Sequence, residues 1–113
     1  MSTPESKVKK RVKALLDKHH AWHNWPVPVG YGVPMLDCVG CHRGRFFAIE
    51  TKAEGETLTP RQEFTKAQME EAGARVFVII GSNDERNPDT WQGWRELTLW
   101  LIDGDAPYVD RDE

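Results

Sequence analysis

The stretch from Met35 to Lys52 reads MLDCVGCHRGRFFAIETK, and it decides the fold that the sequence predicts. Two segments rich in apolar residues, 35–39 and 45–52, flank Gly40-Cys-His-Arg-Gly44, whose glycines are typical of a hairpin connection. We therefore expect two antiparallel strands, Met35–Val39 and Arg45–Lys52, joined by a loop of about five residues.

The segments around this hairpin predict a mixed sheet flanked by helices. Apolar residues at helical spacing follow Ser2 and Thr3, and Thr59-Pro-Arg-Gln62 is a capping-box pattern. A β-branched run after Gly73 is typical of a buried strand, so the second helix and its neighbouring strands form a parallel β-α-β unit. The expected order is α-β-β-β-α-β, with helix 4–19, strand 21–25, the two hairpin strands, helix 60–72 and strand 75–80.

The C-terminal part of the chain allows two interpretations. Asn87-Pro88 favours the start of a last helix, which would carry the apolar residues Trp91, Trp94, Leu97 and Leu101. The alternation of Leu97, Leu99 and Leu101 is equally compatible with a strand.

Length and composition indicate one globular domain, 1–113, with a core at about 4–81 and a C-terminal extension, 82–113. Of the 113 residues, 39% are hydrophobic, and the apolar run near Val76–Ile80 is too short to span a membrane. The first residues lack the apolar segment of a signal peptide, so we expect a cytoplasmic, intracellular protein.

Charge is distributed unevenly along the chain, although the net charge is −3. Residues 1–20 hold six basic side chains against two acidic ones, whereas residues 82–113 hold nine acidic side chains against three basic ones. The N-terminal helix could therefore present a basic face to phosphates, or simply a solvated surface.

Asp37, Glu50 and Lys52 form the constellation with the most distinctive chemistry. Alternation along the strand places Glu50 and Lys52 on one face, and the hairpin brings Asp37 opposite residues 48–50. Two facing carboxylates repel each other unless a cation lies between them, and Mg²⁺ prefers such oxygen ligands. A lysine beside the metal suits hydrolysis of a phosphodiester by activated water. Glu-x-Lys alone would more often be an ordinary surface pair.

This pattern resembles the PD-(D/E)XK nuclease superfamily, and most closely its virus-type replication-repair nuclease (VRR-NUC) branch. The resemblance covers roughly residues 4–81 and is most specific over 30–62, which include GVPMLDCVGCHRGRFFAIETKA and the later LTPRQ. In that superfamily an Asp begins the second strand and a (D/E)-x-K motif lies on the third. One departure is that Pro34 is separated from Asp37 by two residues, whereas the family usually has Pro directly before the Asp.

The resemblance implies a restriction-endonuclease-like α-β-β-β-α-β core and a set of site residues. Asp37, Glu50 and the backbone carbonyl of Thr51 would hold Mg²⁺ or Mn²⁺, and Lys52 would be the catalytic lysine. Glu5 matches the family's helix-borne acid, although a first-turn Glu also suits the positive end of a helix dipole. Gln62 matches the family's glutamine on the second helix, and it can cap that helix at the same time.

The function that the resemblance implies is metal-dependent endonucleolytic hydrolysis of DNA, structure-specific for branched or junction DNA, by a homodimer in a phage or its host cell. The alternative is a non-catalytic DNA- or protein-binding module that keeps the nuclease fold. Candidate phosphate contacts are the basic residues of the first helix and the hairpin, Lys7, Lys9, Lys10, Lys13, Arg43 and Arg45, followed by Arg61 and Lys66.

Cys38-Val-Gly-Cys41-His42 spells the attachment motif of c-type haem. We interpret it as coincidence and expect no haem, because haem attachment occurs in an exported setting and no export signal is seen. A zinc site of Cys38, Cys41, His42 and one of His19, His20 or His23 is the chemical alternative. Against it, Cys38 is expected on the strand face opposite Asp37, and a disulfide is not expected in an intracellular chain.

Overall fold

The computed structural model describes residues 3–27 and 35–105. Residues 30–34, the start of the stretch 30–62 that resembles the nuclease superfamily, lie outside this description, and so do residues 106–113 of the C-terminal extension. The elements, in chain order, are α1 (Pro4–Lys18), β1 (Trp22–Asn24), β2 (Cys38–His42), β3 (Arg45–Lys52), α2 (Pro60–Glu71), β4 (Arg75–Ile80), the 3₁₀ turn η1 (Pro88–Thr90) and α3 (Trp94–Asp105).

The strands form one four-stranded sheet in the order β1-β2-β3-β4. β1 pairs with β2, and β2 with β3, in antiparallel fashion, whereas β3 and β4 are parallel. The prediction of a mixed α/β sheet flanked by helices is therefore confirmed. None of the helices in the described ranges is long and apolar enough to cross a membrane.

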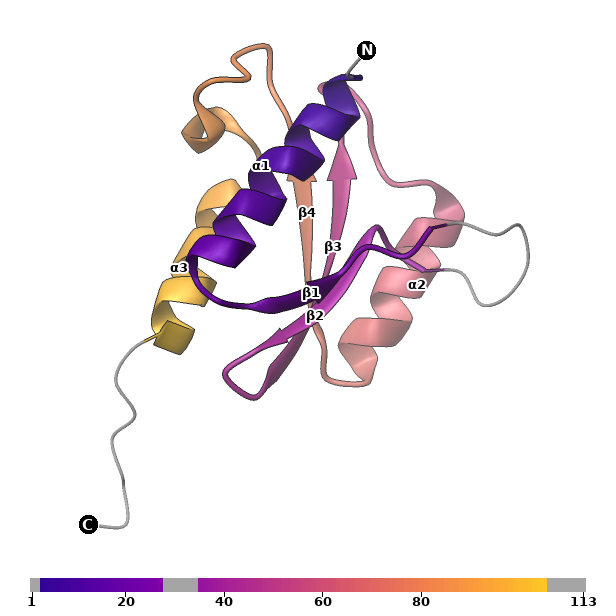
Figure 1. The fold of residues 1–113 in the computed structure, drawn as a ribbon. Coiled ribbons are helices and arrows are strands. Elements are labelled where there is room, and N and C mark those ends of the chain that lie inside the picture. The colour runs from indigo at the N-terminus through magenta and orange to yellow at the C-terminus, as the bar shows by residue number, and fades with distance from the viewer. Residues whose placement is uncertain (1–2, 28–34, 106–113) are drawn as a thin grey trace.

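Helices cover both faces of the sheet, and alternation along β3 sorts its side chains between them (Figure 1). Phe47 and Ile49 join the larger core beneath α1 and α3. Ala48 joins a smaller core beneath α2, which includes Leu36 and Val76. Glu50 therefore points to the α2 side of the sheet, on the same face as Ala48, as the predicted alternation along the strand requires.

Local signals fix the ends of α1 and α2 where the sequence predicts them. Thr3 Oγ1 accepts a hydrogen bond from the backbone N–H of Ser6 at 3.1 Å, which satisfies one free donor of the first turn. Thr59 and Gln62 complete the predicted capping box at the start of α2. That helix ends before Gly73, whose φ of 104° is readily adopted only by glycine.

The hairpin differs from the prediction, because β2 occupies 38–42 and the turn contains only Arg43 and Gly44. Both turn residues have positive φ angles, 53° and 81°, as the tight turns of two-residue hairpins require. Gly40 lies inside the strand instead of in the loop. A Cβ at this position would lie 2.1 Å from the carbonyl oxygen of Trp22 and 2.7 Å from the Phe47 ring, so glycine allows β1 to approach β2 closely.

The C-terminal element is a helix, so the strand interpretation is wrong, and the helix begins later than Asn87-Pro88 suggests. These two residues introduce only the short η1 turn. Gly93 precedes α3 and has a φ of 84°. A Cβ at this position would lie 2.1 Å from the carbonyl oxygen of Val78, so the close approach requires glycine. Leu97 and Leu101 are buried in α3, whereas Leu99 is 53% exposed, which is helical and not alternating periodicity.

The end of α3 is anchored to the rest of the fold by charged and aromatic contacts. The Asp105 carboxylate contacts His19, which follows α1, and the buried His42 of β2. The hydrogen bond from His19 is the main reason that the pKa of Asp105 is lowered. Arg45 stacks on the Trp100 ring at 4.0 Å and donates to its carbonyl oxygen at 2.8 Å. These contacts hold α3 against the hairpin end of the sheet.

Candidate metal centre

Three carboxylates from three different elements meet at the end of β3. Glu5 comes from the first turn of α1, Asp37 immediately precedes β2, and Glu50 lies on β3. One oxygen atom from each lies within 4.8 Å of the others. The donor set consists entirely of hard carboxylate oxygens, which fits the ligand preference of Mg²⁺ and Mn²⁺.

The register of the hairpin brings Asp37 to Glu50. Cys38 pairs with Ile49, so the residue before β2 lies beside the residue after Ile49. The backbone N–H of Asp37 donates to Glu50 Oε1 at 3.0 Å. The side chain of Asp37 is held by Thr51, whose backbone N–H and hydroxyl group donate to Asp37 Oδ2 at 2.9 and 2.8 Å. Asp37 Oδ1 then lies toward α1, where Glu5 and Lys9 are found.

Glu50 is a buried carboxyl group, only 2% exposed, with an unusual acidity. Burial, followed by repulsion from Asp37, raises its pKa from 4.5 to about 7, while Lys52 and the N–H of Asp37 act in the opposite direction. Gln62 donates from Nε2 to Glu50 Oε2 at 2.9 Å, and its other amide atom accepts from the N–H of Thr59 at 3.0 Å. Gln62 thus caps α2 and holds Glu50 with the same side-chain amide.

Two lysines, Lys52 of β3 and Lys9 of α1, lie beside the carboxylates. Lys52 Nζ lies 3.7 Å from Glu50 Oε2, and its side chain is 11% exposed. Lys9 Nζ lies 3.7 Å from Asp37 Oδ1 and 3.9 Å from Glu5 Oε1, and it is more exposed. The ammonium of Lys52 therefore pairs with Glu50, whereas Lys9 partly neutralises the other two acids.

The structure thus gathers the predicted residues Glu5, Asp37, Glu50, Lys52 and Gln62 in one place. The N–H and hydroxyl group of Thr51 orient Asp37. That the carbonyl oxygen of Thr51 is a metal ligand stays a prediction. The contact of Lys9 with two of the carboxylates was not predicted. Its sequence signal is the spacing of four residues from Glu5, which places both side chains on one face of α1.

The basic residues expected to contact DNA fall into two groups. On α1, Lys7 pairs with Glu85 at 3.0 Å, Lys10 is exposed, and Lys13 lies 5.1 Å from the centre of the Trp25 ring. Arg43 and Arg45 lie at the hairpin turn, at the opposite end of β3 from Glu50. Of these six residues, Lys9 alone contacts the carboxylates, and DNA contact by either group stays a prediction.

The residues of the haem-like motif do not come together in the described part of the chain. Cys38 is buried in the larger core, and burial raises the pKa of its thiol to about 12. Cys41 points to the opposite face and is exposed. His42 is already bonded to Asp105 at 2.8 Å and to the Leu101 carbonyl oxygen at 3.1 Å. The structure therefore does not form the zinc site that the motif could have supplied.

Comparison of the chain with protein-family models, with curated proteins and with solved structures gave no match. The chemistry of the carboxylate cluster must therefore be argued from its own geometry. Three converging acids can bind a divalent cation and, through it, a phosphate. An ammonium next to them can stabilise negative charge that develops during hydrolysis.

Proposed function

We propose that this chain is a Mg²⁺- or Mn²⁺-dependent endonuclease that hydrolyses phosphodiester bonds of DNA. The observation that carries the proposal is the convergence of Glu5, Asp37 and Glu50 within 4.8 Å, next to the ammonium of Lys52, whose side chain is 11% exposed. Burial of the Glu50 carboxyl group costs free energy, which a chemical task at this position would explain. The metal, when bound, would polarise the phosphate and lower the pKa of an attacking water.

Each residue has a distinct part in this proposal. Asp37, Glu50 and the Thr51 carbonyl oxygen would hold the metal, and Glu5 would complete the set from α1. Lys52 would donate to the phosphate oxygens, on which charge accumulates as the water oxygen bonds to phosphorus and the P–O bond to the leaving sugar oxygen breaks. The proton that the water loses ends on that leaving oxygen, through solvent. Gln62 would be a positioning residue, because its side-chain amide holds Glu50. The products are one strand end with a phosphate and one with a hydroxyl group.

The choice of DNA rests on the resemblance to the VRR-NUC branch and on the basic side chains of α1. Lys9 and Lys10 lie on the helix that supplies Glu5, so a backbone phosphate at the cluster would lie close to positive charge. Structure-specific cutting of branched or junction DNA, by a homodimer in a phage or its host, is proposed from the resemblance alone.

A second candidate function is a DNA- or protein-binding module without catalysis. The observation that favours it is the pairing of the carboxylates with Lys9 and Lys52 inside the chain. These ion pairs offset part of the negative charge without any metal, so the cluster could be a purely structural network.

A cleavage assay separates the two candidates. Supercoiled plasmid and a synthetic four-way junction are incubated with the wild-type chain and Mg²⁺, Mn²⁺ or EDTA. The matched variants are Asp37→Asn, in the cluster, and Asp17→Asn, an exposed acid that pairs with His23. The nuclease predicts metal-dependent cutting that Asp37→Asn abolishes and Asp17→Asn retains. Folded protein that binds DNA and cuts neither substrate with any metal would support the binding module.

A further inference from the structure

Three exposed side chains form a row across the sheet near the hairpin turn. Trp22 of β1 pairs with Cys41 of β2, which pairs in turn with Phe46 of β3. Directly paired residues point to the same face, and Phe46 shares the face of Ala48, so the row lies on the α2 side of the sheet. Trp22 is 62% exposed, Phe46 is 48% exposed and Cys41 is also exposed. We call these three residues the open row.

The two large rings of the open row have no aromatic or cationic partner among the described residues. Each of the other four tryptophans contacts another aromatic ring: Trp25, Trp91, Trp94 and Trp100. Single exposed apolar side chains are normal at a protein surface. Two large rings on either side of a small thiol, all on adjacent strands, instead form a contiguous patch, which indicates a binding surface.

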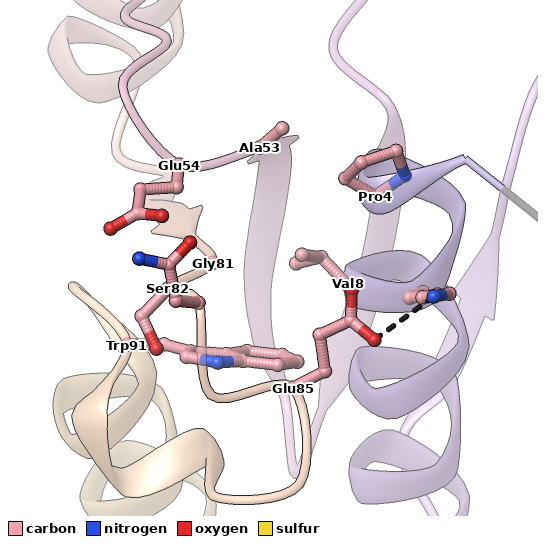
Figure 2. Close-up of a pocket in the computed structure, with 10 residues that line it drawn as sticks. Pro4, Val8, Ala53, Glu54, Gly81, Ser82, Glu85 and Trp91 are labelled. Atoms are coloured by element: carbon pink, nitrogen blue, oxygen red, sulfur yellow. Dashed lines mark hydrogen bonds and ion pairs between the residues drawn. The ribbon is translucent and has the colours of Figure 1, made fainter.

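The hollow at the other end of β3 offers no comparable apolar surface. It has a volume of about 260 Å³, and Trp91 and Val8 are among the residues that line it (Figure 2). These two side chains are only 4% and 3% exposed, because they belong to the larger core. Lys7, which also lines the hollow, is paired with Glu85 at 3.0 Å. The open row, by contrast, presents its rings to solvent.

The chain on either side of the open row carries basic side chains and no acids. His20 precedes Trp22 by two residues, so their Cα atoms lie within about 7 Å of each other. Arg43 follows Cys41 by two residues, and the same limit applies. Both His20 and Arg43 are exposed. The segments 18–24 and 38–49, which contain the open row, have no Asp or Glu.

Acidic side chains near this end of the sheet lie on the helices. Those of α1 and α3 are on the opposite side of the sheet, because both helices pack against the larger core. On the side of the open row, Glu70 and Glu71 end α2, and Glu70 is paired with Lys66 at 2.9 Å. The charge distribution therefore favours a polyanion that runs past His20 and Arg43, away from the end of α2.

His20 and Arg43 also share an unfavourable backbone conformation. Their φ angles are 58° and 53°, and in the described part of the chain all other residues with positive φ are glycines. The left-handed region costs free energy for a residue with a β-carbon, and Asn or Gly is the usual choice in a two-residue hairpin turn. The turn nevertheless contains an arginine, which indicates a function of its side chain rather than of its backbone.

We propose that the open row binds an unpaired strand of nucleic acid, with bases stacked on Trp22 and Phe46 and phosphates beside His20 and Arg43. Every base has a flat face that suits an aromatic ring, and positive charge next to such rings follows the backbone of a single strand. The two rings are two strands apart, roughly 10 Å between backbones, so each ring holds a different base. A duplex does not suit this surface, because its bases are already stacked on each other.

Strand binding in the absence of metal tests the open row apart from cleavage. Fluorescein-labelled oligothymidylate and oligouridylate of about ten nucleotides, a length within the usual range of single-strand sites, are titrated with the chain in EDTA. Fluorescence anisotropy gives the dissociation constants, and a DNA duplex of the same length is the comparison. We expect at least one of the two single strands to bind, and their relative affinities show whether DNA or RNA is preferred.

Variants of Trp22 locate the binding. Trp22→Ala should weaken single-strand binding by at least about tenfold, which corresponds to 1.4 kcal/mol, because one stacked base is lost. Trp22→Phe should restore most of the affinity. Leu99→Ala is the matched control, since Leu99 is 53% exposed on α3, on the opposite side of the sheet. Neither alanine variant should change binding of the duplex, which also reports that each variant is folded.

Arg43→Asn separates the phosphate contact from base stacking. Asn tolerates a positive φ, so the turn is kept while one positive charge is removed. The slope of the logarithm of the binding constant against the logarithm of the salt concentration should become shallower by roughly 0.7. Trp22→Ala should leave this slope unchanged, because it removes no charge.

Several results would overturn the proposal. They are the absence of binding by either single strand, equal single-strand affinities of Trp22→Ala and Leu99→Ala, and an equal loss of duplex binding in Trp22→Ala. A metal-free chain that sediments as a dimer, which Trp22→Ala dissociates and Leu99→Ala does not, would overturn it in favour of an interface with a second copy. Loss of single-strand binding in Trp22→Ala alone upholds the open row even if the chain cuts no DNA, so this proposal and the nuclease proposal fail independently.

Discussion

The backbone N–H of Asp37 donates to the side chain of Glu50 at 3.0 Å, so the two acids are joined by the hairpin before any cation is bound. The hairpin pairing places them side by side, and Thr51 turns the Asp37 carboxylate toward α1. The repulsion between the two acids is therefore built into the fold. It contributes to the raised pKa of Glu50, and it is relieved either by a proton or by a metal.

Glu50 should make the stability of the metal-free chain depend on pH. Its pKa is about 7 in the folded state and near 4.5 when unfolded, so the folded state binds the proton more tightly. This contribution is complete below pH 4.5 and is lost as the pH rises through 7. The free energy of unfolding of the wild type should therefore fall by about 3 kcal/mol relative to Glu50→Gln across this range.

Urea denaturation in EDTA at pH 4.5, 6 and 8 measures this difference. Because the variant shares every other titrating group, subtraction of its unfolding free energies isolates residue 50. A difference that stays constant with pH, or that grows in favour of the wild type as the pH rises, would contradict the raised pKa.

Metal binding should release a proton from Glu50. At pH 7 about half of the Glu50 side chains would be protonated, since the pKa is about 7, and a bound cation requires the carboxylate. Titration calorimetry with Mn²⁺ in two buffers of different ionisation enthalpy should reveal release of about half a proton per ion at pH 7. At pH 9 the release should vanish and the affinity should be higher. Equal heats in both buffers at pH 7 would argue against Glu50 as a ligand.

Lys9 should compete with the metal. Its ammonium lies within 4 Å of oxygen atoms of Asp37 and Glu5, so a divalent cation must displace it or bind against its charge. Replacement by methionine should tighten Mn²⁺ binding by about fivefold, which corresponds to about 1 kcal/mol of repulsion near water. DNA binding should weaken in the same variant if Lys9 also contacts phosphates.

Lys10 provides the control for this substitution. It lies on the same helix with an exposed side chain, and the same change to methionine should leave Mn²⁺ affinity unaltered. A Lys9→Met variant whose Mn²⁺ affinity equals or falls below that of Lys10→Met would show that Lys9 is not a competing cation.

Substitutions at Gln62 and Thr59 should distinguish the role of Gln62 in capping α2 from its role in holding Glu50. Gln62→Ala removes the bond to Glu50 and half of the capping box, and Thr59→Ala removes only the other half. Each change should lower the unfolding free energy by about 1 kcal/mol. Only Gln62→Ala should also weaken Mn²⁺ binding, because the backbone N–H of Thr59 still holds Gln62 in the other variant. Equal loss of Mn²⁺ affinity in both variants would mean that Gln62 acts only through the helix.

Most of the sheet could be predicted from the sequence, because its strands carry strong local signals. The exception is the hairpin, for which the sequence predicts that Gly40 and Gly44 both lie in the loop. Gly44 turns the chain with a positive φ, whereas Gly40 has an extended conformation and admits the backbone of β1. A sequence shows that a residue is glycine, but it does not show whether the missing side chain serves a turn or a close contact.

The candidate site could be predicted where its residues share a strand or a helix. Glu50 and Lys52 follow from alternation, and Asp37 follows from the hairpin. Lys9 approaches Asp37, Asp105 contacts two histidines, and a pocket forms above Trp91. These three features depend on how α1, α3 and the loop after β4 pack against the sheet. Those arrangements are set by tertiary contacts, which carry no periodic signal in the sequence.

The most direct test of the central claim is DNA cleavage by Lys52→Met, measured together with its Mn²⁺ binding. Lys18→Met is the matched control, since Lys18 is an exposed lysine in the last turn of α1. We predict that the wild type and Lys18→Met cut plasmid DNA with Mg²⁺ or Mn²⁺. Lys52→Met should lose at least about a hundredfold in rate, yet it should still bind Mn²⁺. Cleavage by Lys52→Met at the wild-type rate would contradict the assignment of the catalytic centre.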